Sequence, residues 1–155
     1  AMEPLLFEYG VNLAIYGHDH HYERTYPVFQ EEVYSNNSGN MSNPYYNPGA
    51  TIHIVAGNSG REVYDGLVEP QPEWSAYREL SYGYTKFDAT KTSINYKFIR
   101  NSDGSIGDEF WLFNTDSSDS GNEGSSNKMN KSLSSLGLLH AIIGICVVSI
   151  INPKR

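Results

Sequence analysis

The chain has 155 residues, of which 39% are hydrophobic and 13% aromatic, enough for one ordinary domain with an apolar core. All 18 acidic residues lie within residues 1–124 together with only seven Lys and Arg, whereas residues 125–155 carry four basic groups and no acidic one. An acidic body argues against a nucleic acid partner, because phosphate backbones bind to basic surfaces.

The first part of the chain predicts one helix and two strands. Residues 2–9 combine apolar and acidic positions in a pattern typical of a short helix. The apolar runs at 11–16 and 51–56 each have the length of a buried strand, and a glycine follows each run directly. Between these runs, residues 30–50 are rich in Asn, Ser, Tyr, Pro and Gly and predict a long surface loop.

The following segments predict further strands. Residues 84–88 and 93–99 alternate between apolar and polar side chains and indicate a hairpin around the turn at 89–92. Residues 109–113 indicate a last strand. We therefore expect residues 1–113 to form one β-rich domain of the α/β class.

Residues 114–155 differ in composition from the rest of the chain. Residues 114–135 consist largely of Ser, Asn, Gly and Asp and predict a disordered linker. Residues 136–155 predict an apolar C-terminal helix, since 136–151 contain no Asp, Glu, Lys or Arg. The polar spacer before this tail fits a glycolipid-anchor signal, whereas its basic end suits a single-pass transmembrane helix. Both alternatives stay open, and both place the preceding domain outside the cytosol, anchored to the membrane by this tail.

Three sequence triplets match the acceptor pattern for N-glycosylation. Asn36 and Asn40 lie in the predicted surface loop, and Asn130 lies in the linker. Together with the tail, these three candidate sites favour a secretory route and an extracellular or cell-surface location.

A candidate metal site follows the first predicted strand. In the segment Gly17-His18-Asp19-His20, the two histidines are separated by one residue. If this segment is extended, residues i and i+2 project to the same side, so the two imidazoles aim at one small volume. Imidazole is the commonest protein ligand for metal ions, so His18 and His20 are the candidate metal ligands.

The residues around this segment resemble a known motif. Residues 5–28 read as an apolar strand, then G-H-x-H, then Y-E-R, and they resemble the last metal-binding motif of the purple acid phosphatases, a binuclear branch of the metallophosphoesterases. The resemblance continues through residues 51–60 and 74–84 and ends near Phe113. It implies that this chain is the C-terminal portion of a metallophosphoesterase β-sandwich with flanking helices.

The resemblance also implies a role for each histidine. His18 is expected to ligate a divalent ion (zinc, iron or manganese), and His20 is expected to ligate a ferric ion. Two metal ions held close together can clamp a phosphate and activate water for attack. The implied activity is acid phosphatase, the hydrolysis of phosphate monoesters by a secreted or surface-bound enzyme.

The family's other metal-binding motifs are absent from these 155 residues, and two imidazoles cannot hold a binuclear centre alone. We therefore expect a C-terminal fragment that needs the missing N-terminal half of the catalytic domain and is inactive by itself. No residue of this chain is assigned a direct catalytic role.

Two residues of the motif have two interpretations each. Glu23 and Arg24 are candidates for outer partners that orient His20 through hydrogen bonds, with a structural ion pair as the alternative. The neighbouring His21 is expected to be exposed.

Two further residues lie near the second predicted strand. His53 alternates with two isoleucines and is expected either to face the cleft or to be a hydrogen-bonded structural histidine. Asn58 lies in a loop flanked by glycines and is expected either to approach substrate or to form a turn. A function of another class also remains open, a surface-tethered, non-catalytic β-rich binding or adhesion domain in which the histidines are incidental.

Overall fold

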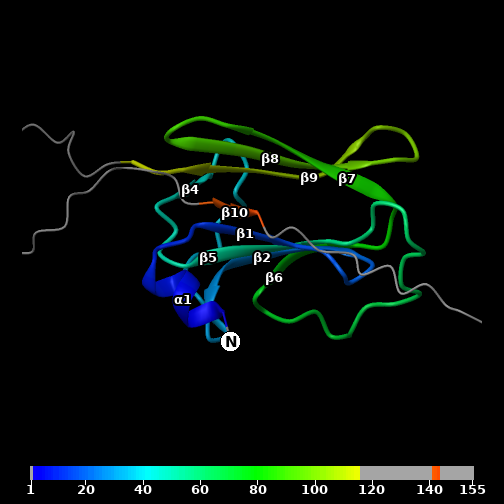
Figure 1. Cartoon of the computed structure of the whole chain (residues 1–155), viewed down its shortest axis with the longest axis horizontal. Helices are drawn as coiled ribbons and strands as arrows, with labels where there is room; N and C mark the ends of the chain where they lie inside the picture. Colours follow the sequence, from blue (N-terminus) through cyan, green and yellow to red (C-terminus); the bar gives the residue numbers. More distant parts are fainter. Residues whose placement is uncertain (1, 116–140, 144–155) are drawn as a thin grey trace, which may run out of the picture.

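One helix and ten strands form in the residues that the computed structural model describes, 2–115 and 141–143 (Figure 1). In chain order these elements are α1 (Glu3–Glu8), β1 (Leu13–Tyr16), β2 (Tyr22–Phe29), β3 (Glu32–Val33), β4 (Tyr45–Tyr46), β5 (Thr51–Ala56), β6 (Ser75–Glu79), β7 (Gly83–Ala89), β8 (Ser93–Arg100), β9 (Ile106–Phe113) and β10 (Ala141–Ile143).

The strands form two sheets that lie one above the other (Figure 1). The six-stranded sheet has the order β10-β1-β5-β2-β3, with β6 also paired to β2. The four-stranded sheet has the order β4-β9-β8-β7. Each sheet mixes parallel and antiparallel pairs, since β1 is parallel to β5 and β4 is parallel to β9. The prediction of a β-rich domain is confirmed.

The strands expected from the sequence form, but several others were not predicted. The strand expected at 51–56 is β5, and the expected hairpin is the pair β7 and β8. The short strands β3 and β4 lie inside the predicted loop 30–50. Sequence reasoning also missed β2 and β6. The eight residues of β2 include charged positions and Pro27 and lack a simple alternation.

Side chains from both sheets meet in one apolar core. Ile52 and Ile54 of β5 are fully buried there, and the Tyr22 ring stacks on Phe98 of the other sheet with centroids 4.2 Å apart. The buried members of this core are Leu13, Tyr22, Tyr45, Ile52, Ile54, Ile94, Tyr96, Phe98, Phe110 and Leu112.

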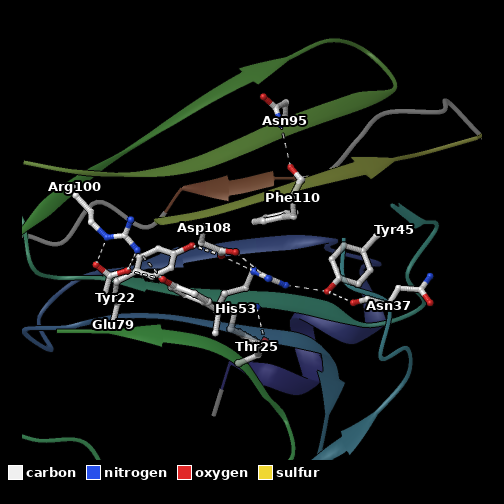
Figure 2. A network of polar contacts seen from close by, with 12 residues as sticks. Tyr22, Thr25, Asn37, Tyr45, His53, Glu79, Asn95, Arg100, Asp108 and Phe110 are labelled. Carbon is white, nitrogen blue, oxygen red and sulfur yellow. Dashed lines mark hydrogen bonds and ion pairs between the residues drawn. The ribbon is translucent and has the colours of Figure 1, made fainter. Parts of the chain in front are cut away.

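A charged pair crosses this core. Arg24 of β2 donates from Nε to Oδ2 of Asp108 in β9 at 2.7 Å and from Nη2 to Oδ1 at 3.0 Å. Tyr22, two residues earlier on the same strand, donates its hydroxyl to the same carboxylate at 2.8 Å (Figure 2). Arg24 also donates to the hydroxyl of Tyr45 at 3.0 Å and lies over the ring of Phe110. These contacts join the two sheets. All three guanidinium nitrogens of Arg24 and both carboxylate oxygens of Asp108 have hydrogen-bond partners.

A second ion pair joins the sheets nearer the surface. Arg100 of β8 donates to both carboxylate oxygens of Glu79 in β6, at 2.6 and 2.7 Å (Figure 2). Hydrogen bonds from Arg100 lower the pKa of Glu79 to about 2, with further hydrogen bonds from Ser81 and Tyr77 acting in the same direction.

The helix α1 covers the outer face of the six-stranded sheet, on the side away from the four-stranded sheet (Figure 1). Pro4 in its first turn suits a helix start, because no backbone N–H is needed there. Leu6 packs with Val11 and Ala14 in a small second core. Within the part of the chain that is described, this is the one flanking helix of the fold.

The linker and most of the apolar tail lie outside the described residues. Ala141–Ile143 form the strand β10, parallel to β1. The apolar helix expected over residues 136–155 stays a prediction. Among the residues described, no helix is long and apolar enough to cross a bilayer.

We expect the buried pair to stabilise the fold far more than an exposed pair. Asp108→Asn leaves the Arg24 charge buried without its counter-charge, and should lower the free energy of unfolding by about 3 kcal/mol. The control is Glu69→Gln, which breaks the ion pair of Arg78 with a carboxylate that is 73% exposed, at a cost below about 1 kcal/mol. Urea titration of both variants measures this difference, and equal losses would contradict the assignment.

Candidate metal centre

The segment with the two histidines is a bend that carries the chain across the end of β5. β1 lies on one side of β5 and is parallel to it, whereas β2 lies on the other side and is antiparallel. Residues 17–21 must therefore reverse the chain direction while passing over the end of β5. The carboxyl ends of β1 and β5 meet at this edge, which is where α/β sheets hold their ligands.

The bend is not extended, so one premise of the sequence argument is wrong. His18 has φ of 81°, in the left-handed region, and the backbone N–H of His21 donates to the carbonyl of Asp19 at 2.9 Å. The alternation of an extended strand therefore does not set the directions of His18 and His20. His18 is exposed and His20 is half-buried, so both rings remain accessible at this edge.

The close approach of the bend to β5 requires glycine at position 57. A Cβ atom on Gly57 would lie 1.9 Å from the carbonyl oxygen of Asp19, the residue between the two histidines. The backbone N–H of Gly57 also donates to the carbonyl of His21 at 3.3 Å. Since any side chain here collides with backbone, Gly57 fixes how closely the bend packs on β5.

Tyr64, from the loop after β5, packs against the outer side of the bend. Its hydroxyl donates to Oδ1 of Asp19 at 3.1 Å, and its backbone N–H donates to the carbonyl of His20 at 3.1 Å. Its ring lies 5.5 Å from the ring of His20, centroid to centroid. The bend thus packs against Gly57 at the end of β5 and against Tyr64 in the following loop.

His21 is buried, which corrects the expectation that it is exposed. Only 8% of this residue is accessible, and its Nε2 lies 3.2 Å from a carboxylate oxygen of Glu23. Ser75 of β6 donates to the other oxygen of Glu23 at 2.6 Å. Burial alone would raise the pKa of Glu23, but the hydrogen bonds from His21 and Ser75 outweigh it and leave this pKa below its ordinary value.

Arg24 points away from Glu23, because adjacent residues of a strand face opposite sides. Its side chain lies in the core on Asp108, so it forms the structural ion pair that was one of its two interpretations. Burial would lower the pKa of Arg24, but the hydrogen bonds and charge of Asp108 outweigh it and raise this pKa. A role for Glu23 or Arg24 in orienting His20 remains a prediction.

His53 and Asn58 have structural partners on or beside β5. His53 lies opposite Ala14 on the outer face, and its Nδ1 is 3.0 Å from the hydroxyl of Tyr16. Burial lowers the pKa of His53, with only partial opposition from Glu3. Asn58 is almost completely buried and donates from Nδ2 to the carbonyl of Ser81 at 2.5 Å. Their suggested functional roles are not tested by these contacts.

The donor set at the bend suits a metal ion in kind but not in number. Imidazole nitrogen is a good ligand for zinc and iron, and both rings lie at an accessible edge. Within residues 2–115 and 141–143, however, no group of three or more His, Cys, Asp or Glu side chains is placed to hold a metal ion. These residues therefore fit part of a metal centre whose other ligands come from elsewhere.

The glycosylation candidates Asn36 and Asn40 are exposed, and Asn130 lies outside the described residues.

Comparison with known proteins shows which proteins this chain resembles. Residues 50–109 match the family model described as iron/zinc purple acid phosphatase-like protein C. Acid phosphatase type 7 of Danio rerio is 42% identical over 96 residues, covering 61% of this chain and 21% of that protein. Probable inactive purple acid phosphatase 1 of Arabidopsis thaliana is 38% identical over 113 residues, covering 72% of this chain and 18% of that protein.

A solved structure agrees with these matches. Purple acid phosphatase PPD1 from yellow lupin seeds (Lupinus luteus) superposes with a TM-score of 0.67 and 29% identity, over 73% of this chain and 19% of that chain. In sequence and in fold, this chain is similar to the C-terminal part of purple acid phosphatases. It spans about a fifth of the length of these relatives. Members of this family carry a binuclear metal centre, which agrees with a partial donor set.

Sequence reasoning missed three residues that hold the bend or the strand after it. Asp108 has a usable signal, because it alternates with Phe110 and Leu112 on an apolar strand and must therefore face the core as a paired carboxylate. Gly57 and Tyr64 have none, since their importance depends on contacts across the sheet edge that the sequence does not specify.

The packing of the bend on β5 can be tested by adding a single methyl group. Gly57→Ala forces the Asp19 backbone to move and should lower the free energy of unfolding by about 1–3 kcal/mol. The control Gly60→Ala lies three residues later in open space and should change it by less than about 0.5 kcal/mol. Thermal or urea unfolding of both variants measures this, and a neutral Gly57→Ala would show that the bend does not depend on this contact.

Proposed function

We propose that the full-length protein is an acid phosphatase that hydrolyses phosphate monoesters at a binuclear metal centre, to which this chain contributes His18 and His20. The observation that supports this most directly is the position of both histidines on a bend at the carboxyl ends of β1 and β5. The similarity to purple acid phosphatases suggests the reaction class.

His18 is proposed to bind a divalent ion (zinc, iron or manganese), and His20 is proposed to bind a ferric ion. Such a pair of ions, when bound, can clamp the phosphate and activate water for attack on phosphorus. The residues of this chain hold the two imidazoles in place. Gly57 and Tyr64 fix the backbone around Asp19. Tyr22 and Arg24 attach β2, the strand after the bend, to the four-stranded sheet.

The remaining metal ligands are proposed to come from polypeptide outside these 155 residues. This proposal is supported by the relatives, which are about five times as long as the part they share with this chain, and by the incomplete donor set of the described residues. By itself the 155-residue chain should show no turnover of an aryl phosphate.

A non-catalytic role is the second candidate. It is favoured by the similarity to the Arabidopsis relative, which is named probable inactive purple acid phosphatase 1. In that case the domain would act as a surface-tethered binding or adhesion module, and the histidines would have no metal.

The ligand assignment predicts a loss of both metal and activity. In the full-length protein, His18→Ala and His20→Ala should each lower kcat/KM for an aryl phosphate by more than about 100-fold, because even outer partners of a metal site are worth 10–100-fold. Bound metal, measured by mass spectrometry, should fall as well. The control is Tyr84→Ala, which removes a half-exposed ring from β7 in the four-stranded sheet and should change neither the activity nor the metal content.

A full-length protein with wild-type activity after either substitution would rule out that ligand. Absence of metal and of turnover in the unaltered protein would favour the non-catalytic alternative.

We also propose that the domain is extracellular or on the cell surface and that residues 136–155 anchor it to the membrane. The exposure of Asn36 and Asn40 is compatible with glycosylation in the secretory pathway. Treatment of the protein from its native cells with an N-glycosidase should increase its electrophoretic mobility, and unchanged mobility would count against glycan attachment at these sites.

A further inference from the structure

We propose that a pocket beside the bend receives the leaving group of the phosphate ester, and that it selects uncharged aromatic groups. The inference rests on the proposed phosphatase function and assigns the substrate class. The pocket has a volume of about 300 Å³ and lies between the start of β2, β6 and the loop that joins β5 to β6. We call it the Trp74 pocket, after its largest apolar wall residue.

The pocket lies directly next to the proposed metal ligands. His21, one of its wall residues, follows His20 in the chain. Tyr64 is another wall residue, and its ring lies 5.5 Å from the ring of His20 and 5.8 Å from that of His21. A phosphate held by these histidines could direct its leaving group toward the pocket, because Tyr64 contacts His20 and also lines the pocket.

The walls favour an apolar ring. Among the residues that line the pocket beyond the bend and β2, four are apolar: Leu67, Val68, Pro72 and Trp74. An aromatic group placed against such walls buries apolar area and can stack on the indole of Trp74. A volume of about 300 Å³ is at the lower end of the range for ligand pockets, which suits one or two rings.

The charged residues that line the pocket are already paired, which argues against a charged leaving group. Glu23 accepts hydrogen bonds from His21 and Ser75. The Arg78 guanidinium, of which the side chain is only 8% exposed, donates to Glu69 and to the carbonyl of Val68. A second phosphate or a carboxylate on the leaving group would find no unpaired cation in these walls.

The pocket can be tested by inhibition with two phosphonates. Phosphate esters with different leaving groups also differ in reactivity, and inhibition constants avoid this difference. Phenylphosphonate and methylphosphonate present the same anionic head, but only the former carries a ring. In the active full-length protein, Trp74→Ala should raise the inhibition constant of phenylphosphonate by about tenfold and that of methylphosphonate by less than about twofold.

Leu67→Gln is the milder variant, because Leu67 is half-buried in a loop and its substitution should leave the fold intact. It should raise the same constant selectively, by about threefold. The matched control is Tyr84→Ala, which removes a half-exposed aromatic ring from β7 in the other sheet and should change neither constant.

If phenylphosphonate inhibits no more strongly than methylphosphonate, or if both pocket variants shift the two constants equally, the pocket proposal is wrong while the phosphatase function stands. If the unaltered protein has no turnover and binds neither phosphonate, the proposed function fails and the pocket proposal fails with it.

Discussion

Asp108 reaches from the four-stranded sheet to Arg24 and Tyr22 in the six-stranded sheet, and the position of the bend depends on this contact. An arginine and a carboxylate that are both about 95% buried stabilise a fold only when their hydrogen bonds are satisfied, and here both carboxylate oxygens and three guanidinium nitrogens are used. The contact fixes the first residues of β2 relative to the core. Because the bend ends where β2 begins, the same contact fixes one end of the segment that carries His18 and His20.

The topology of the six-stranded sheet determines why that segment is a bend. β1 and β2 lie on opposite sides of β5 and run in opposite directions, so five residues must cross the end of a strand and reverse the chain. A left-handed φ at His18 and the absence of a side chain at Gly57 make this crossing possible. Two imidazoles are thereby presented at an accessible edge, while Tyr64 and the Trp74 pocket lie immediately beside them.

Much of the architecture was predictable, because apolar runs and alternation report local structure directly. β5 and the β7–β8 hairpin follow from such patterns. The resemblance to purple acid phosphatases agrees with the family model that matches residues 50–109. The sequence did not reveal the bend, the burial of His21, or the partner of Arg24. Each depends on a partner distant in sequence, such as Glu23 with Ser75 or Arg24 with Asp108, 84 positions away. Spacing along a chain cannot identify such partners.

The central claim is that His18 and His20 bind metal ions in the full-length protein. X-ray diffraction from crystals of that protein, collected above and below the iron and zinc absorption edges, tests it most directly. We predict two anomalous peaks, one about 2.0–2.1 Å from an imidazole nitrogen of His18 and one at a similar distance from His20. A metal-loaded protein whose peaks lie away from both rings would contradict the account.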